Sequence, residues 1–254
     1  VNMDDPYGQR LFDKTPAALG YGFARHERRK ERRVLNGLVL EQSREGLRLR
    51  MDFAGEPWEL HSPLVGEFNA ANLLGVQALA LAFGLAPRDF RVLETFNGVP
   101  GRLERVPNNR GLAVFVDYAH TPDALQKALL ALRGARFERI ITVFGCGGNR
   151  DRAKRPLMGE AAAALSEVVV LTSDNPRKEE PLAIMADARP GLAKARKLIE
   201  EADRKRAIGL ALDEMRPGDA LLIAGKGHEP YQIIGDTRHP FSDQQVVKEL
   251  LGCV

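Results

Sequence analysis

The 254-residue sequence is poor in cysteine and has no long apolar run. Its two cysteines, Cys146 and Cys253, are too few for a disulfide framework or a cysteine zinc site, and they favour a reduced, cytoplasmic compartment. The longest apolar stretch, residues 73–83, contains Gly75 and Gln77 and is shorter than the ~20 residues that span a bilayer. We therefore expect no membrane insertion, and no secretory leader is recognisable.

Aromatic residues make up only 6% of the chain, and the net charge of +3 is unevenly distributed. Residues 25–33 contain six Arg or Lys and two Glu, so this segment carries +4 and the remainder −1. Nucleic-acid binding needs a wider basic surface with stacking aromatics, so we expect no nucleic-acid partner. We interpret the segment as a solvated, charged stretch of a folded protein of ordinary composition, with 44% hydrophobic and 28% charged residues.

Two common nucleotide-binding motifs are also missing. The glycines at 145, 147 and 148 are spaced Gly-x-Gly-Gly, so no third glycine stands at the position that the dinucleotide fingerprint requires. This spacing counts against a dehydrogenase. Gly225-Lys226-Gly227 lacks both the glycine five positions earlier and the Ser or Thr that completes a P-loop. The sequence therefore predicts no triphosphate cradle of that kind within this chain.

The first part of the chain favours a small antiparallel meander followed by helices. Apolar and polar residues alternate from Leu47 to Phe53, and glycines punctuate residues 34–60. Residues 69–83 and 87–96 favour helices, and residues 1–6 the end of a strand entering a turn. Residues 97–101 are the best candidate for a linker.

Beyond the linker, continuous apolar runs alternate with helical stretches, which predicts a doubly wound parallel sheet of the α/β class. The predicted strands are 113–116, 140–144, 168–171 and 220–223. The predicted helices are 122–132, 154–165, 181–201 and 204–214.

Each predicted strand ends in a polar loop, and ligands of such sheets bind at the carboxyl ends of the strands. The four loops are residues 117–123, 145–151, 173–177 and 225–229. In the third loop, Asp174 can bind an ammonium group and Arg177 a carboxylate, which are the two ends of an amino acid. Arg150 adds a second forked donor for a carboxylate or phosphate.

Other interpretations of these loops stay open. The glycine-rich loop can be a tight strand-to-helix turn, and Asn175-Pro176 can be a turn that ends a strand. Asp117 and His120 can act as acid and base, or as a ribose-binding carboxylate beside a loop histidine. Asn69 can cap the helix that follows, or it can contact a nucleotide base with Asn72. Cys146 has no neighbouring base and is not expected to be a nucleophile.

Taken together, seven segments resemble the Mur ligases, and most closely the members that add 2,6-diaminopimelate. In chain order the segments are residues 66–72, 101–104, 117–123, 143–155, 174–177, 224–232 and 231–243. The resemblance implies that residues 1–98 are the end of a P-loop-type central ATP-binding domain, and that residues 99–254 are a Rossmann-like C-terminal domain that binds the amino acid. The uridine-binding domain, P-loop, Mg²⁺-binding acid and carbamylated lysine of the family have no counterpart here, so catalytic residues are expected upstream and this chain alone is expected to be inactive.

The implied reaction is ATP- and Mg²⁺-dependent ligation of meso-diaminopimelate to UDP-N-acetylmuramoyl-L-alanyl-D-glutamate through an acyl phosphate. It implies a role in peptidoglycan synthesis, and hence in cell-wall biogenesis, cell shape and division, for a cytoplasmic monomer. By resemblance, the residues that bind the amino acid are Arg150, Asp174, Asn175, Pro176, Arg177, Gly225 and Glu229. Those around ATP are Asn69, Asn72, Arg102, Asp117 and His120, and no residue is assigned to a metal.

Rival hypotheses remain. The chain can be a non-catalytic fragment that binds an amino acid or a nucleotide. It can also belong to a lysine-adding or other related ligase, such as a folylpolyglutamate synthase or cyanophycin synthetase. In the Mur ligases the Asp-Asn-Pro-Arg motif at 174–177 is typical of the enzymes that add meso-diaminopimelate. Its arginine would be left unpaired by lysine, which lacks the distal carboxylate, and an unpaired buried charge is costly.

Overall fold

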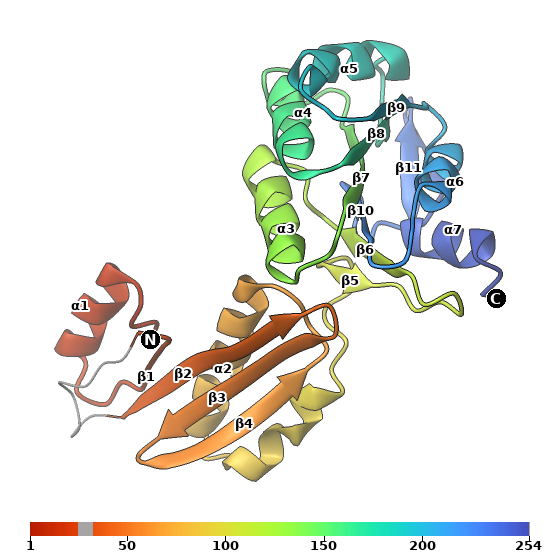
Figure 1. The fold of residues 1–254 in the computed structure, drawn as a ribbon. Helices are drawn as coiled ribbons and strands as arrows, with labels where there is room; N and C mark the ends of the chain where they lie inside the picture. The colour runs from red at the N-terminus through yellow and green to blue at the C-terminus, as the bar shows by residue number, and fades with distance from the viewer. Residues whose placement is uncertain (25–32, 254) are drawn as a thin grey trace. The chain divides into compact units, whose positions relative to one another are not determined.

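The computed structural model describes residues 1–24 and 33–253, and these form two compact units, residues 1–97 and 98–254 (Figure 1). The division falls at the start of the predicted linker. Residues 25–32, most of the basic segment, lie outside the described part, so its interpretation stays a prediction. No helix among the described residues is both long and apolar enough to cross a membrane.

The first unit contains a four-stranded sheet in the order β1-β2-β3-β4, with α2 packed against it. Strands β2, β3 and β4 are antiparallel neighbours, which confirms the predicted meander, and β1 adds a parallel strand at the edge. The elements are α1 (Pro6–Lys14), β1 (Gly20–Gly22), β2 (Val34–Ser43), β3 (Gly46–Phe53), β4 (Glu56–Ser62), α2 (Glu67–Ala82) and the 3-10 helix η2 (Pro87–Glu94).

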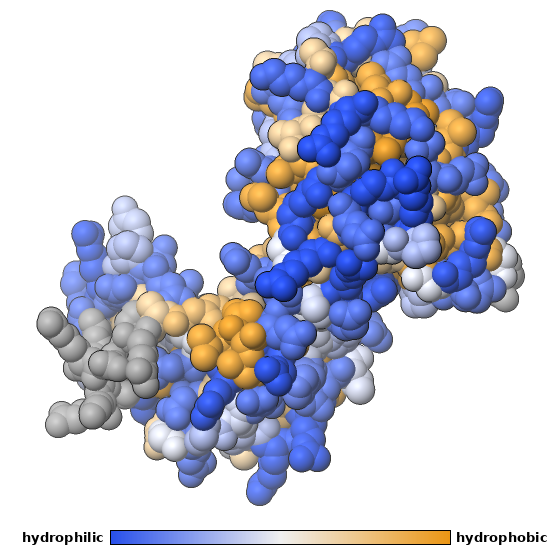
Figure 2. All heavy atoms as spheres, in the orientation of Figure 1, coloured by the Kyte–Doolittle hydropathy of each residue, from blue (hydrophilic) through white to orange (hydrophobic). Residues whose placement is uncertain are grey.

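Alternation along β3 explains how this unit forms its core. Leu47, Leu49 and Met51 are buried in one cluster with residues of α2, whereas the arginines between them face solvent. Helix α2 is apolar on more than one side: Val76 and Leu79 are more than half exposed. Figure 2 shows a hydrophobic patch on the visible face of this unit among mostly hydrophilic side chains.

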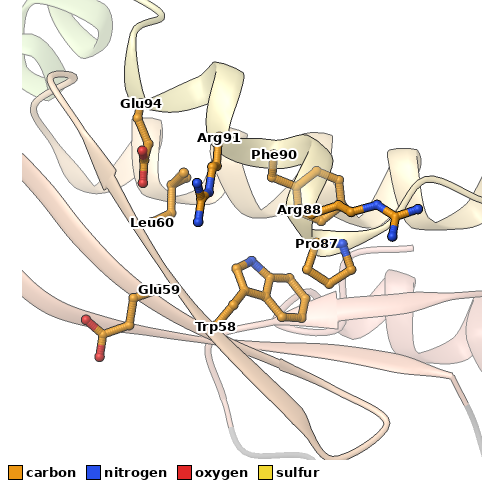
Figure 3. A pocket seen from close by; sticks show the side chains of 8 residues that line it. All are labelled: Trp58, Glu59, Leu60, Pro87, Arg88, Phe90, Arg91 and Glu94. Carbon is orange, nitrogen blue, oxygen red and sulfur yellow. The ribbon is translucent and has the colours of Figure 1, made fainter.

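A pocket of about 350 Å³ lies between β4 and η2 (Figure 3). Trp58 stands on the strand side, and Pro87 and Phe90 face it from η2. The Trp58 and Phe90 ring centroids are 5.9 Å apart, and Trp58 Nε1 donates to Gln77 Oε1 at 2.9 Å. The residues that line this pocket include none of the predicted site residues.

Two local expectations in the first unit need correction. Asn2 pairs with Tyr21 in an isolated bridge, as the end of a strand would, but the chain then enters a helix at Pro6 instead of a turn. Asp5 caps this helix by accepting from two backbone N–H groups, and proline suits the first helical position, so the sequence did contain the signal. Asn69 is not a helix cap, because α2 begins two residues earlier, after Gly66.

The second unit contains a six-stranded sheet in the order β5-β6-β10-β7-β8-β9. All neighbours except β5 and β6 are parallel, which confirms the predicted doubly wound sheet. The sheet elements and their helices are β5 (Glu104–Arg105), β6 (Ala113–Asp117), α3 (Pro122–Gly134), β7 (Ile140–Cys146), α4 (Lys154–Leu165), β8 (Val168–Ser173), α5 (Pro181–Ala188), η3 (Arg189–Leu192), β9 (Leu198–Glu200), α6 (Arg204–Asp213) and β10 (Ala220–Ala224). A hairpin of β11 (Tyr231–Ile234) and β12 (Thr237–Pro240) and helix α7 (Asp243–Leu250) complete it.

Helices cover both faces of this sheet. Figure 1 shows α3 and α4 on one face and α6 and α7 on the other. Strands β6, β7, β8 and β10 are buried almost throughout, as expected when both faces are covered. The buried core under α6 and α7 contains alternate residues of the central strands, such as Val116, Val143 and Ile223. This rigid layer holds the loops at its carboxyl edge.

The single helix predicted for residues 181–201 is wrong. Helix α5 ends at Ala188, a short 3-10 helix follows, and the chain then forms edge strand β9. Pro190 lacks the N–H that continues a helix. Gly191 lies so close to α4 that a Cβ would come within 1.9 Å of Pro156 O, which explains the change of direction.

Candidate functional site

The four predicted loops meet at one edge of the second sheet. Strands β6, β10, β7 and β8 are neighbours in that order, and all four are parallel, so their carboxyl ends lie side by side. The chain runs outward from β6 through β7 and β8 to β9 and then crosses back, so that β10 lies between β6 and β7. Open α/β sheets bind their ligands where the order of the strands reverses in this way.

The loop after β8 is anchored to the hairpin strand β11 through its backbone. Gln232 Nε2 donates to Asp174 O at 2.6 Å, and Ile233 N donates to Asn175 Oδ1 at 2.9 Å. Arg177 N donates to Ile233 O at 3.0 Å, so Arg177 pairs with β11 as in a parallel bridge. The Asp-Asn-Pro-Arg motif is therefore held in one conformation by a strand that follows it by more than fifty residues.

Four side chains form a cluster at this loop and the next one, which we name the buried cluster: Asp174, Asn175, Lys226 and Glu229. Lys226 is fully buried, and its Nζ lies 3.1 Å from Asn175 Oδ1, 3.5 Å from Glu229 Oε2 and 3.7 Å from Asp174 Oδ1. Asn175 Nδ2 donates to Glu229 Oε2 at 2.9 Å. Three predicted site residues thus converge on one lysine that the sequence analysis did not assign.

Asp174 is the electrostatically costly member of the buried cluster. Burial raises the pKa of its carboxyl, although Arg204 and Lys226 oppose that shift. Its Oδ1 atom has no hydrogen-bond partner among the described residues. Gly225 has a positive φ of 116°, and a Cβ there would lie 3.1 Å from Asp174 Oδ2, so glycine avoids crowding this buried carboxylate.

A buried ion pair lies beneath the same two loops. Arg204 makes a two-pronged pair with Asp243, at 2.8 Å for each hydrogen bond, and both side chains are fully buried. Arg204 also donates to Ala224 O at 3.0 Å and Ser173 O at 3.4 Å, the last residues of β10 and β8. It therefore ties together the two strand ends from which the buried cluster emerges.

Arg155 supports the glycine-rich loop after β7 in a comparable way. Its guanidinium, 2% exposed, bonds both carboxylate oxygens of Glu179 at 2.9 Å and Asp187 at 2.7 Å. Glu179 also accepts from Asn149 N in the glycine-rich loop. These hydrogen bonds, above all the one from Arg155, hold the pKa of Glu179 below its usual range. The loop after β8 is thereby bonded to the loop after β7.

The two predicted carboxylate-binding arginines differ in their freedom. Arg177 is half-buried and has a positive φ of 52°, an uncommon conformation for a residue with a side chain. Its Nη1 donates to Gly148 O at 2.9 Å, which directs the guanidinium across the glycine-rich loop. Arg150 lies exposed in that same loop. A Cβ at Gly148 would come within 1.8 Å of Pro176 O, so the two loops are in direct backbone contact.

Asp117 is fixed by backbone donors. Its Oδ2 accepts from Leu103 N at 2.6 Å and its Oδ1 from Ala119 N at 2.8 Å. Burial raises the pKa of Asp117, and these two hydrogen bonds oppose the shift. Both oxygens retain a lone pair, so the carboxylate can still accept from a ribose hydroxyl, whereas a proton-transfer role gains no support from this geometry.

Residues 101–104, with the sequence Gly-Arg-Leu-Glu, anchor the carboxyl edge of the sheet. Gly101 has a positive φ of 70°, and a Cβ there would come within 2.3 Å of His228 N. Gly101 N donates to Glu104 Oε2 at 2.7 Å, and Gln244 Nε2 donates to the same oxygen at 2.9 Å. The segment therefore packs directly against the loop after β10.

A second group, which we name the exposed cluster, comprises Arg102, Tyr118, His120 and His228. The Arg102 guanidinium lies 5.1 Å from the centroid of the Tyr118 ring. The two histidine rings lie 4.7 and 5.8 Å from that ring, and His120 Nδ1 is 2.8 Å from Tyr118 O. Both histidines and Arg102 are exposed, so this cluster offers cationic and ring groups to a ligand.

Asn69 and Asn72 lie in the first compact unit, on α2. Asn69 Nδ2 donates to Val65 O at 2.9 Å, so one amide hydrogen is already used, and Asn72 is exposed. Their predicted contact with a nucleotide base stays a prediction. Among the described residues, no group of three or more His, Cys, Asp or Glu side chains could hold a metal ion.

Residues 101–227, half of the chain, match the family model of the Mur ligase glutamate ligase domain. The chain belongs to the Mur ligase family. The matched residues include every member of the two clusters except His228 and Glu229, which directly follow the end of the match.

Similar proteins sharpen this placement of the Mur ligase chain. It is 57% identical over 253 residues to a protein of Lawsonia intracellularis named UDP-N-acetylmuramoyl-L-alanyl-D-glutamate–2,6-diaminopimelate ligase, covering 100% of this chain and 52% of that protein. A protein of the same name in Aquifex aeolicus is 44% identical, covering 99% and 51%. The chain thus spans about half the length of these relatives.

Solved structures agree with the fold. A structure of a UDP-N-acetylmuramoyl-L-alanyl-D-glutamate–2,6-diaminopimelate ligase aligns with a TM-score of 0.74 at 34% identity, covering 99% of this chain and 52% of that one. Folylpolyglutamate synthase from Thermotoga maritima aligns with a TM-score of 0.62 at 17% identity, covering 87% and 56%. The second likeness shows a shared fold alone.

Proposed function

We propose that this chain is the amino-acid-binding part of an ATP-dependent ligase that adds meso-diaminopimelate to UDP-N-acetylmuramoyl-L-alanyl-D-glutamate in peptidoglycan precursor synthesis. Family membership and the names of the relatives support a ligase of this kind. In this proposal residues 1–98 are the end of the central ATP-binding domain and residues 99–254 are the C-terminal domain. The use of ATP and of a nucleotide-linked precursor places the enzyme in the cytoplasm.

One observation carries the proposal: acidic and guanidinium groups meet at the same loop cluster. Asp174 and Glu229 form an acidic side, and Arg177 emerges from the same loop as Asp174 and crosses the glycine-rich loop that carries Arg150. Diaminopimelate has an ammonium and a carboxylate at each end, so it can pair with both sides. Lysine has no distal carboxylate and would leave a guanidinium unpaired.

The chemistry assigned to these residues is placement. ATP supplies the phosphoryl group that converts the D-glutamate carboxylate into an acyl phosphate, which the amine of the amino acid attacks with loss of phosphate. The loops of this chain would bind the amino acid, hold its amine in one orientation and exclude water from it. Orientation alone is worth several kcal/mol of barrier, on the order of 7–11 in the best intramolecular cases.

The exposed cluster fits the polar part of a nucleotide. Arg102 offers a forked donor for phosphate oxygens, Tyr118 a ring face, and His120 a ring nitrogen. Asp117 retains acceptor capacity for ribose, and we propose that Asn69 and Asn72 contact the base. We assign no residue of this chain to Mg²⁺ and derive no step from it.

Calorimetry on this chain with meso-diaminopimelate and L-lysine, titrated side by side, tests the proposal. We expect diaminopimelate to bind at least about tenfold more tightly, because each charged hydrogen bond to the distal carboxylate is worth about 1.5–3 kcal/mol. Equal or tighter binding of lysine would overturn the assigned specificity and favour a lysine-adding ligase. Binding of neither would contradict the claim that these residues form an amino-acid site by themselves.

A further inference from the structure

Lys226 is a fully buried lysine whose ammonium group lies among three predicted site residues. Its contacts to Asn175, Glu229 and Asp174 are 3.1, 3.5 and 3.7 Å, and the Tyr231 ring centroid is 5.9 Å away. Burial of a lysine is unfavourable, and burial indeed lowers the pKa of Lys226 while Asp174 counters the shift. A packing role alone would be filled better by an apolar side chain of similar volume.

Lys226 and the backbone of Ile233 together determine which way the Asn175 amide faces. Lys226 Nζ and Ile233 N both donate to Oδ1, so this atom must be the carbonyl oxygen. The amide nitrogen is then forced toward Glu229 Oε2, to which it donates at 2.9 Å. Without the lysine, Ile233 alone would hold Oδ1, and Glu229 would lose its nearest cation.

The charge balance of the cluster also depends on this lysine. Arg204 is matched by Asp243, which leaves Lys226 against the two carboxylates of Asp174 and Glu229. Counted with formal charges, the two carboxylates and one ammonium of the buried cluster sum to −1, which suits one ammonium group of an incoming amino acid. Removal of Lys226 would leave two carboxylates without a cation between them, a state that favours uptake of a proton.

We propose that Lys226 is a positioning residue of the amino-acid site, which orients Asn175 and Glu229 and sets the cluster to the single negative charge that one ligand ammonium neutralises. The inference rests on the proposed function for the identity of the ligand. The orientation of Asn175 is a property of the chain by itself, so the two can be tested separately.

The first test follows the Asn175 side-chain amide by ¹⁵N NMR in the 254-residue chain, with Asn175→Asp to assign its signals. In Lys226→Met we expect the two amide-proton shifts to move toward those of a free asparagine, because Oδ1 loses one of its two donors and Glu229 loses the cation that holds it beside the amide. Lys178→Met is the matched control, since Lys178 pairs with Asp236 at the surface. Unchanged Asn175 signals in a folded Lys226→Met variant would overturn the proposal, whatever the ligand proves to be.

The second test measures the affinity for meso-diaminopimelate by calorimetry. We expect at least about a thirtyfold loss in Lys226→Met and no change in Lys178→Met. In Lys226→Ala, n-propylammonium should restore affinity and 1-propanol should not, because only the former replaces the missing charge. Rescue by both compounds would show that the side chain merely fills space, and full affinity without rescue would also contradict the proposal.

The two tests separate the possible failures. If the wild-type chain binds no diaminopimelate, the proposed function fails, and the Asn175 signals still decide the role of Lys226. If the wild-type chain binds and Lys226→Met binds equally well, the proposed function stands and the positioning role is wrong. A variant that unfolds is replaced by Lys226→Gln, which keeps a hydrogen-bond donor for Asn175 Oδ1 but lacks the charge.

Discussion

The buried cluster and the exposed cluster lie along one edge of the same sheet but are built in opposite ways. In the buried cluster, Lys226 and Asn175 are enclosed, and they are hydrogen-bonded or ion-paired to their neighbours. In the exposed cluster, Arg102 and both histidines are exposed and lie around the Tyr118 ring. The first cluster is organised before any ligand arrives, whereas the second presents its cationic and ring groups to solvent.

This difference matters because the two clusters face different energetic demands. Pre-organised, desolvated charges discriminate between ligands, because a wrong ligand leaves a buried group unpaired. Exposed cations attract a highly charged ligand such as a nucleotide, but water competes for each contact. We infer that selection of the amino acid is assigned to the buried cluster and that the exposed cluster contributes affinity with little selectivity.

The largest predicted effect comes from removing the ion pair between Arg204 and Asp243, which lies beneath the buried cluster. Asp243→Asn keeps the shape of the side chain but leaves Arg204 as an uncompensated buried charge. We expect a loss of about 3–5 kcal/mol in the free energy of unfolding, measured by urea denaturation.

Asp123→Asn is the matched control for that substitution. Asp123 pairs with Lys127 one helical turn away, and both side chains are largely exposed. Its loss should change the free energy of unfolding by no more than about 0.5 kcal/mol. Similar effects of the two substitutions would contradict the contrast between enclosed and exposed charges.

A second prediction compares two alanine substitutions: one at Arg177, in the same loop as Asp174 and Asn175, and one at Arg102 in the exposed cluster. Arg177→Ala removes the donor assigned to the distal carboxylate, so the preference for meso-diaminopimelate over L-lysine should fall by about 10–100-fold. Arg102→Ala should leave that preference unchanged and weaken the binding of ATP, as measured by calorimetry with each ligand. An unaltered preference in Arg177→Ala would sink the assignment of this arginine.

The smallest predicted effect concerns the reactivity of the Cys146 thiol, at the end of β7. Burial, followed by the nearby Asp174, raises the pKa of Cys146 to about 12. In a Cys253→Ser chain, iodoacetamide should therefore label Cys146 very slowly at about pH 8, where only ~10⁻⁴ of it is thiolate. The rate should rise about tenfold per pH unit toward 12.

The sign of the same shift fixes its effect on stability. The folded chain holds the Cys146 proton more tightly than the unfolded chain, whose thiol has a pKa of 9.0. Stability is therefore unaffected by this group below about pH 9 and falls as the pH rises above it. Rapid labelling of Cys146 at about pH 8 would show that the loop after β7 opens, and that the buried cluster is less enclosed than the structure shows.

The sequence predicted the elements whose signals are local. The strands of the second unit appear as continuous apolar runs, and β3 as a strict alternation, so both are confirmed. Residues 181–201 were misjudged in two ways: the local signal of Pro190, which cannot continue a helix, was overlooked, and the close contact of Gly191 with Pro156 lies outside any local window of sequence. Helix α1 was missed although Asp5-Pro6 is a start signal, because the helix has only nine residues and few of them are apolar, with Phe12 alone buried.

The site shows the same division between local and distant causes. The loops could be found because polar residues follow apolar strands, and the Asp174–Arg177 motif is contiguous. Lys226, Arg155 and Arg204 were not assigned, because Asn175, Glu179 and Asp243, with which they pair, lie 51, 24 and 39 residues away, and nothing in the sequence marks a lysine or arginine as enclosed. The local hints were the glycines on either side of Lys226 and Glu229 three residues after it.

The contact between Gly148 and Pro176 also limits how such a site can evolve. The backbones that carry Arg150 and Arg177 already touch, so neither loop can be lengthened or shifted toward the other without disturbing both. A lineage that came to use a different amino acid would therefore change side chains on an unchanged frame. One or two codons, rather than an insertion or a rebuilt loop, would be the shortest route to a new specificity.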